Sequence, residues 1–231
     1  LVCGEPIADI PTAIGGDTAI IIKGEAFGDS FDFQAFDGLG QDAVYHPYLQ
    51  ASVGLPKGFE FKVRYSPKIE IDNSNFEILG LGIQSNLNAL FKSEDGDSER
   101  QFLDFSALIS YSKFEVDFIF DPFELPGAVI DRTIIDANSW LVQLIASKQI
   151  NRFELFYAMG YTNTTFNYEL GGEQSLFLDA LNQSLTTLDN GQVDLKFDFG
   201  FNYNFKKITL NNTFSFGKFA NYNLGIYYTI N

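Results

Sequence analysis

The sequence contains no uninterrupted apolar run of the roughly 18 residues that a membrane-spanning helix requires. A membrane span in this chain is therefore a strand of a closed barrel, because only helices and closed barrels satisfy every backbone polar group inside lipid. Basic residues are also scarce, with 15 Lys and Arg against 30 Asp and Glu and a net charge of −15. This balance argues against nucleic-acid binding, which needs a basic surface. It is typical of solvated loops; the alternative is acidic outer loops whose divalent cations bridge to lipopolysaccharide.

Residues that carry catalytic or metal chemistry are nearly absent. His46 is the only histidine and Cys3 the only cysteine, so the chain offers no nucleophile triad and no internal disulfide. No serine motif accompanies His46, as a Ser-His-Asn lipase would need. We find no zinc-ligand spacing and no phosphate-cradling glycine loop, and the acidic stretch from Glu94 to Glu99 lacks EF-hand spacing. We therefore predict no enzymatic activity, no metal site and no cofactor.

Aromatic residues are abundant, with 25 Phe and 11 Tyr, and they favour β-strands. From Gln192 to Lys206 apolar and polar residues alternate without interruption, as expected of a strand between lipid and a polar lumen. Similar alternation recurs along the chain. The residues that it predicts to face lipid are Phe59, Phe61, Val63, Phe114, Phe118, Phe153, Tyr157, Phe197, Phe199, Phe201, Tyr203, Phe205, Leu224, Ile226 and Tyr228. The residues that it predicts to face the lumen are Glu60, Lys62, Arg64, Lys68, Asp104, Glu115, Asp117, Glu154, Asp194, Lys196 and Asp198.

A soluble β-sandwich also alternates, but its strands usually run about five or six residues. The clearest strands here run nine to 15 residues, the length that a tilted bilayer crossing needs. We therefore predict an all-β fold, a transmembrane antiparallel β-barrel over residues 18–231, after an irregular segment 1–17. About 12 strands are expected, within a range of 10 to 14. They are residues 18–24, 28–36, 44–55, 59–71, 76–84, 101–111, 113–120, 133–148, 152–169, 191–206, 207–216 and 220–230.

The connections between these strands alternate in length, which predicts their sides. Outer-membrane barrels have long extracellular loops and short periplasmic turns. The expected long loops are 85–100, 121–132 and 170–190, and Pro122 and Pro126 exclude a strand interior in the second. The expected short turns are Asp72–Asn75, Ser112–Lys113, Gln149–Asn151 and Lys206–Lys207. A further tight turn, at residues 53–58, falls on the outer side.

Leucines between Ser175 and Leu188 recur at helical spacing, and Gly191 supplies a stop. They predict a short amphipathic helix over the barrel mouth; the alternative is a helix that docks a partner. Residues 83–91 have the same spacing over one or two turns. Gly80 and Gly82 share one face of the preceding strand, where they allow bending or close approach.

Short patches at residues 54–68, 80–82, 139–148 and 157–161 resemble segments of an uncharacterised family of outer-membrane barrels from Bacteroidota. Residues 54–68 (GLPKGFEFKVRYSPK) match its "GLPKGTE…VRYFPK" strand pair, and Gly80-Leu81-Gly82 its glycine-rich strand. Residues 139–148 (SWLVQLIASK) resemble its "SWTVQALISKK" strand, and 157–161 its "YGGVGYN". Gln84 stands where that family usually has a basic residue, and its "GWYNTA" region is not visible. The resemblance implies a barrel fold in the bacterial outer membrane and brings no activity.

The predicted lumen carries both signs of charge, which fits interstrand ion pairs or, as the alternative, a polar permeation path. We expect a passive channel or transporter for small or hydrophobic solutes, integral to the bacterial outer membrane. The alternative is a non-catalytic structural or accessory subunit of a larger outer-membrane complex. The expected partners are outer-membrane lipid, lipopolysaccharide and other outer-membrane proteins.

Overall fold

The computed structural model describes residues 21–26, 29–34, 46–71, 74–90, 103–125, 128–186, 191–217 and 220–230. The chain divides into two compact units, Leu1–Pro47 and Tyr48–Asn231. The predicted segment 1–17, Cys3 and the acidic stretch from Glu94 to Glu99 lie outside the described residues. Within the described residues, no helix is both long and apolar enough to cross a membrane.

The first unit contains a hairpin of two short strands, β1 (Ile21–Ala26) and β2 (Asp29–Gln34). The strands pair antiparallel in register from Ile21 opposite Gln34 to Ala26 opposite Asp29. The sequence predicted both strands as members of the barrel. In the structure they form a two-stranded sheet of their own.

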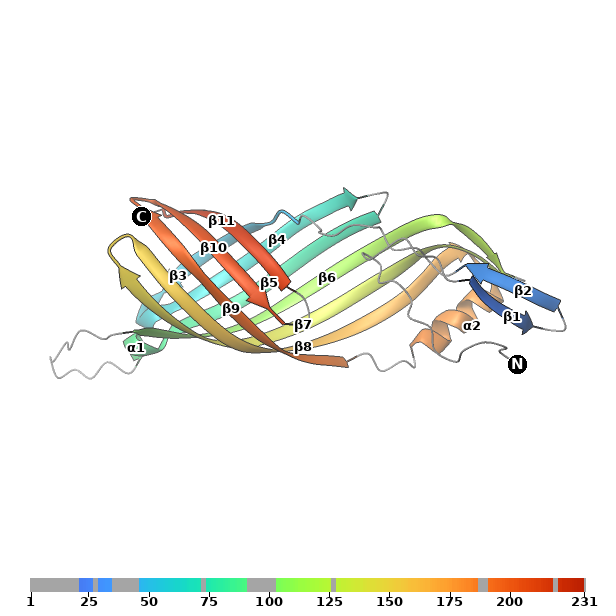
Figure 1. Ribbon diagram of the computed structural model, residues 1–231, viewed down its shortest axis with the longest axis horizontal. Coiled ribbons are helices and arrows are strands. Elements are labelled where there is room, and N and C mark those ends of the chain that lie inside the picture. Colours follow the sequence, from blue (N-terminus) through green and yellow to red (C-terminus); the bar gives the residue numbers. More distant parts are fainter. Residues whose placement is uncertain are drawn as a thin grey trace. The chain divides into compact units, whose positions relative to one another are not determined.

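The second unit is built on one antiparallel sheet of nine strands, in the order β11-β10-β9-β8-β7-β6-β5-β4-β3. The strands are β3 (Leu49–Leu55), β4 (Phe59–Ile71), β5 (Ser74–Asn86), β6 (Asp104–Leu125), β7 (Ala128–Ile150), β8 (Phe153–Glu173), β9 (Gly191–Phe205), β10 (Ile208–Phe216) and β11 (Ala220–Tyr228). Each strand pairs with its neighbour in the chain, so the sheet has no crossover (Figure 1). The predicted all-β antiparallel architecture is confirmed; the expected count of about 12 strands is not.

Tight turns join several of these strands. Asn151 and Lys206 each open a two-residue turn with positive φ, at 55° and 56°. Lys57, with φ 65°, and Gly58, with φ 76°, turn the chain between β3 and β4. Positive φ lets a short loop reverse the chain in keeping with the twist of its strands.

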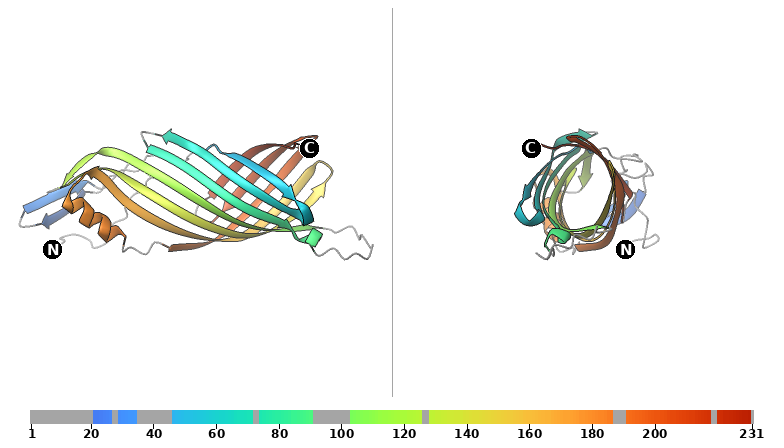
Figure 2. Two further views of the ribbon diagram at one scale, coloured as in Figure 1. Left: turned by 180° about the vertical axis from the view of Figure 1, so that it is seen from behind. Right: turned by 90° about the vertical axis from the view of Figure 1, so that its left-hand side faces the viewer.

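The sheet curls about its own concave face, and the right-hand view of Figure 2 shows its strands around an oval. The edge strands are β3 and β11, and the described residues contain no backbone ladder between them. Because successive strands of a nine-stranded meander alternate in direction, β3 and β11 run the same way. Each edge strand has its ladder on one side only.

The predicted turn at Ser112–Lys113 is wrong, because both residues lie inside strand β6. It is one strand of 22 residues, and both residues pair in register with β7, opposite Ser139 and Asn138. The sequence showed the apolar residues changing from odd positions, such as Tyr111, to even ones, such as Phe114. In the sequence such a change of phase resembles the break between two strands, which the predicted turn at Ser112–Lys113 would supply. The strand continues, and what changes at this point is which of its faces is apolar.

The prediction of a long loop over residues 121–132 is also wrong. β6 runs to Leu125 and β7 starts at Ala128, so strand fills most of that range. Pro122 lies in β6 where the register with β7 shifts between Ile119 and Phe123. A proline has no N–H to give to a ladder, and a bulge is the position in a sheet that tolerates it. β4 has the same arrangement at Pro67, where the register shifts between Ser66 and Ile69.

Two predicted strands are the single strand β6. The connections before β6 therefore lie, relative to those after it, at the opposite end of the sheet from the one predicted. The connection from β5 to β6, which includes all but the first two residues of the predicted loop 85–100, lies at the same end of the sheet as the turns at Asn151 and Lys206. The connection from β8 to β9, within the predicted loop 170–190, lies at the opposite end. The long connections therefore do not share one side.

The predicted helix in residues 175–188 is confirmed as α2 (Leu176–Leu185). Ser175 caps it, accepting a hydrogen bond at Oγ from the backbone N–H of Leu178 at 3.1 Å. Leu178 is only 4% exposed and packs with Ala128 and Ile130 of β7. Asn182 is hydrogen-bonded to both the N–H and the C=O of Leu170 in β8. The shorter helical segment is a single turn, α1 (Leu87–Leu90).

Candidate functional site

The concave face of the sheet encloses a cavity of about 410 Å³. All nine strands contribute to its lining, from Gln50 of β3 to Tyr227 of β11. Most lining side chains carry hydroxyl or amide groups. They are Tyr48, Gln50, Ser110, Ser112, Ser139, Gln143, Thr162, Asn211, Thr213, Ser215, Asn223 and Tyr227. Because alternate residues of a strand share a face, β6 and β10 each bring polar residues at period two to this interior.

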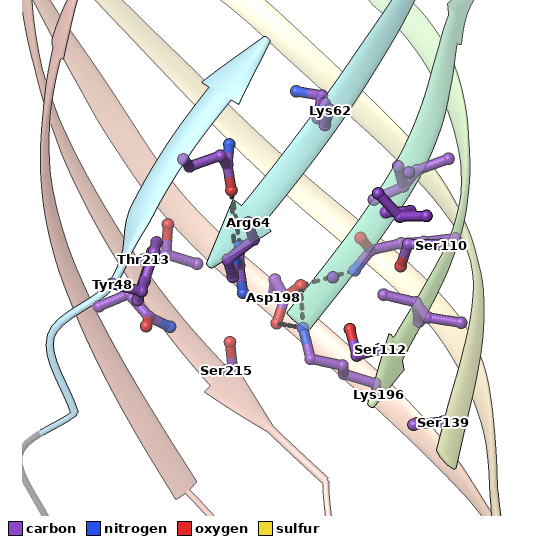
Figure 3. A pocket seen from close by; sticks show the side chains of 18 of the residues that line it. Tyr48, Lys62, Arg64, Ser110, Ser112, Ser139, Lys196, Asp198, Thr213 and Ser215 are labelled. Carbon is purple, nitrogen blue, oxygen red and sulfur yellow. Dashed lines mark hydrogen bonds and ion pairs between the residues drawn. The ribbon is translucent and has the colours of Figure 1, made fainter. Parts of the chain in front are cut away.

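Four charged side chains line the cavity, and the sequence predicted all four to face inwards. Lys62 and Arg64 come from β4, and Lys196 and Asp198 from β9 (Figure 3). Three are cationic and one is anionic, although acids outnumber bases twofold in the whole chain. The lining is thus locally basic in an acidic protein.

Two glycines of β5 lie directly opposite the basic residues of β4. Gly80 pairs with Arg64, and Gly82 pairs with Lys62. A Cβ on Gly80 would lie 3.3 Å from the Cβ of Arg64 and 3.3 Å from Ser112 Oγ. These glycines leave room for the long basic side chains, as close approach in a strand requires.

Asp198 is the centre of a buried polar cluster. It is 6% exposed and accepts a hydrogen bond from Gln143 Nε2 at 2.6 Å. Lys196 Nζ donates to both carboxylate oxygens, at 2.7 and 2.5 Å. Buried charges are tolerated when they are paired and hydrogen-bonded, and Asp198 is both.

Gly160 is the reason that this cluster can form. Gln143 belongs to β7 and Asp198 to β9, and β8 lies between them with Gly160 opposite Gln143. A Cβ on Gly160 would lie 3.1 Å from Gln143 Cβ and 2.9 Å from the carbonyl oxygen of Val142. Only a residue without a side chain lets Gln143 cross β8 so closely. Sequence alternation could not indicate this bridge between non-adjacent strands.

Arg64 is held differently, by neutral groups. Its Nε and Nη2 donate to Gln50 Oε1 at 3.1 and 2.9 Å, and its guanidinium lies 4.4 Å from the centroid of the Tyr48 ring. Tyr227 of β11 lines the same cavity. Lys62, by contrast, pairs with Glu60 at 3.1 Å. Tyr48, Gln50 and Tyr227 were not among the predicted site residues, although Gln50 and Tyr227 each occupy a polar-face position of an alternating strand.

The other predicted lumen residues are dispersed. Glu154 accepts a hydrogen bond from Asn202 at 2.9 Å, and Asp194 accepts one from Gln192. Asp104 accepts one from Asn88 of α1 at 3.2 Å. Lys68 lies in the bulge of β4 between Ser66 and Ile69.

Four residues of β6 lie on the opposite face from the one predicted. Ser110 and Ser112 line the cavity, and the ladder continues without a shift from Asp104 to Ile119. Alternation therefore puts Phe114 and Phe118 on the concave face and Glu115 and Asp117 on the convex face. The predicted turn at Ser112–Lys113 had exchanged the two faces beyond it.

Around the cavity the convex face is apolar. Alternate outward positions carry exposed hydrophobic side chains on strand after strand. Examples are Phe61, Tyr65, Leu79, Ile83, Ile109, Val142, Leu144, Leu155, Tyr157, Met159, Leu195, Phe199, Leu210, Phe214, Leu224 and Ile226. Monomeric soluble proteins rarely expose a continuous apolar surface of this kind.

Aromatic residues border this surface at both ends. At one end Trp140, the only tryptophan, lies against Tyr111 with ring centroids 5.1 Å apart. Tyr111 Oη also donates to Asn138 at 2.5 Å, where the convex face becomes polar. At the other end Phe153 and Tyr203 lie 4.9 Å apart, next to the turns at Asn151 and Lys206. Aromatic girdles at both edges are typical of membrane barrels.

Beyond Trp140 both faces exchange character. We call residues 113–125, 128–138 and 165–173 of β6, β7 and β8 the extension. On its convex face Lys113 pairs with Glu115 at 3.3 Å and with Asp136 at 3.6 Å. The hydrogen bond to Glu115, with the charge of Asp136, raises the pKa of Lys113.

The concave face of the extension is apolar instead. Val116 and Ala137 are buried, at 7% and 4% exposure. At the far end, Leu178 of α2 packs on the core formed with Ile130, against Phe120 and Leu170. The extension thus has the polar exterior and apolar interior of a protein in water.

One family model, described as a family of unknown function (DUF6588), matches residues 4–230. The searches of the curated proteins and of the solved structures returned no match. No group of three or more His, Cys, Asp or Glu side chains that could hold a metal ion occurs among the described residues. Because the match covers nearly the whole chain, the protein belongs to DUF6588, a family of unknown function.

Proposed function

We propose that the chain is an integral β-barrel of the bacterial outer membrane, in Bacteroidota as the sequence resemblance implies, and that its interior is a passive path for small polar solutes. The observation that carries the proposal is the exchange of both faces at Trp140 and Tyr111. Around the cavity the exterior is apolar and the interior polar, and in the extension the order is reversed. A bilayer explains the first arrangement and water the second.

The apolar band has a height that fits a membrane. From Phe153 to Tyr161 on β8, eight intervals of about 3.4 Å give about 27 Å along the strand, or about 21 Å along a membrane normal at a tilt of about 40°. From Val193 to Phe205 on β9, twelve intervals give about 41 Å and about 31 Å in the same way. The two values bracket the apolar band of about 25 Å that is typical of outer-membrane barrels.

The interior supports small polar solutes over hydrophobic ones. The lining is rich in hydroxyl and amide groups, and the Asp198 cluster lies along this wall, over β8 and between β7 and β9. Phe156 also lines the cavity. Because the cavity has a volume of only about 410 Å³, we expect low conductance.

In a bilayer the edges of β3 and β11 require hydrogen-bond partners, because unpaired backbone groups in lipid cost several kcal/mol each. The proposal therefore includes a further strand between these two edges. Since β3 and β11 run in the same direction, one strand of opposite direction pairs with both.

Two measurements test the proposal. In detergent gels the unheated protein should migrate faster than the boiled protein, as closed barrels do, and in planar bilayers it should give small ohmic steps. A protein that remains a soluble monomer without detergent would contradict the membrane assignment. A heat-modifiable barrel that is electrically silent would contradict the channel and leave the membrane assignment in place.

The second candidate is a non-catalytic accessory subunit of a larger outer-membrane complex. The open edges favour it, because an unpaired edge strand is a template for a strand of another chain. The edge strands are also exposed, with Leu49 of β3 at 75% and Ile226 of β11 at 74%. Purification in mild detergent should then yield a stoichiometric partner chain. A monomer that is complete and stable by itself would overturn this candidate.

A further inference from the structure

We propose that Arg64 is the centre of an oxyanion-binding site in the cavity, and that the path selects small solutes bearing a carboxylate or a phosphate. This deepens the proposed channel, and its consequence for transport rests on that function. The binding site itself is a property of the folded interior and can be measured without conduction.

The first argument is the balance of charge in the cavity. Lys196 is neutralised by Asp198, and Lys62 is paired with Glu60. Arg64 makes no ion pair with a carboxylate among the residues that the structure describes; its partners there are the neutral Gln50 and Tyr48. One full positive charge thus remains uncompensated within the lining.

The second argument is the set of donors left on the guanidinium. An arginine side chain has five N–H groups, and Gln50 accepts from Nε and from Nη2. Both groups of Nη1 and the second group of Nη2 have no acceptor among the described residues. One of them on Nη1 and the remaining one on Nη2 form the parallel fork that binds a carboxylate or phosphate in bidentate fashion.

The third argument is that this fork is fixed and accessible. Gln50 holds one edge of the guanidinium while the Tyr48 ring covers a face. Gly80, opposite Arg64 on β5, has no side chain to cover it. The Arg64 side chain is exposed and lines the cavity, so a solute can reach it. A donor fixed before the ligand arrives loses less entropy on binding.

The surroundings suit an anion that also carries hydroxyl groups. Thr213 and Ser215 of β10 and Ser110 and Ser112 of β6 line the same cavity (Figure 3). Tyr227 of β11 adds a phenol to the same lining. Hydroxyl groups can donate to an oxyanion or accept from a hydroxylated solute.

The decisive experiment is titration calorimetry of the whole protein in detergent with three sodium salts: gluconate, phosphate and chloride. We expect saturable binding of gluconate or phosphate and much weaker binding of chloride, whose single atom cannot accept two parallel hydrogen bonds as a pair of oxygens does. The salt that binds more tightly, gluconate or phosphate, shows whether the site prefers a carboxylate or a phosphate. Absence of saturable binding of both oxyanions by the wild-type protein would overturn the proposal.

Three variants assign the site. R64Q should weaken binding about tenfold or more, as expected for losing a charged hydrogen-bonding partner. R64K keeps the charge without the fork and should show an intermediate loss. The matched control K113Q removes a positive charge from the convex face of the extension and should bind like the wild type. Equal losses in R64Q and K113Q, or wild-type affinity in R64Q, would overturn the proposal.

Bilayer recordings separate this inference from the channel itself. In a gradient of sodium gluconate, the reversal potential should indicate anion preference in the wild type and shift towards cation preference in R64Q. A silent bilayer together with oxyanion binding would overturn the channel and support the site. Conduction with a reversal potential that R64Q does not change would support the channel and overturn the selectivity. Heat-modifiable migration of each variant verifies that it is folded.

Discussion

The part of the sheet around the cavity and the extension share the strands β6, β7 and β8 and differ in which face is apolar. On β8 the convex face carries Phe153, Leu155, Tyr157, Met159 and Tyr161, then continues with Asn163, Thr165, Asn167 and Glu169. The concave face of the same strand changes from Thr162 and Thr164 to Phe166, Tyr168 and Leu170. Backbone pairing is continuous across the change. Since the backbone hydrogen bonds are the same in both parts, they do not determine which face of the strand is apolar. We infer that the medium in contact with each face does.

A charge on the concave face should lower the stability of the fold much more in the extension than around the cavity. Val116→Asp places a carboxylate where the side chain is 7% exposed, and we expect a loss of about 3 to 5 kcal/mol, typical of an uncompensated buried charge. Ser110→Asp puts the same group in the polar cavity and should cost far less. Urea unfolding from micelles measures both. Equal losses would mean that the interior does not change character along β6.

A charge on the convex face provides the complementary comparison. Leu144→Arg lies in the apolar band. In a band that spans a bilayer, as proposed, Arg should cost about 2 to 4 kcal/mol near the midplane. Asn167→Arg lies on the polar exterior of the extension and should be close to neutral. The free energy of folding into phospholipid vesicles gives both values. If Leu144→Arg folds as readily as Asn167→Arg, the apolar band does not contact lipid.

The packing of α2 should matter to the extension alone. Leu178→Ala removes the best-buried side chain of the helix and should destabilise its docking by about 2 to 3 kcal/mol. Leu176, 91% exposed on the same helix, provides the control Leu176→Ala. Hydrogen exchange of the amides of α2 and of the end of β8 should accelerate in the first variant only. Acceleration that spreads to β9 and β10 would mean that the two parts are not independent.

The smallest effect is expected at the cap of α2. Ser175→Ala removes the acceptor of the Leu178 N–H and should cost about 1 kcal/mol of helix stability. Ser175→Asp restores an acceptor and should recover most of that loss. Exchange rates of the first-turn amides are the measurement. Unchanged rates in Ser175→Ala would show that tertiary packing alone holds the helix.

The sequence predicted the fold better than the site, for reasons visible in particular residues. Alternation located β4, β8, β9 and β11, because a strand with unlike faces must repeat every two residues. The same rule failed at Ser112–Lys113, where alternation changed phase within a continuous strand. The prediction that Pro122 excludes a strand interior was also wrong, because a bulge accommodates this proline inside β6. Lys62, Arg64, Lys196 and Asp198 were placed on the polar face of their strands, and the structure brings all four to one cavity.

By itself the sequence determined the all-β antiparallel architecture, the apolar band and helix α2, because each is a local pattern that a few consecutive residues carry. Only the tertiary structure decided the rest. The Gln143–Asp198 bridge depends on Gly160 in the strand between its two partners. The exchange of faces at Trp140 can be recognised only when β6 is known to pair with β7 without a shift from Asp104 to Ile119. Among the described residues Arg64 has neutral partners, Gln50 and Tyr48, and these neighbours in space are assigned only by the pairing of strands in the curled sheet.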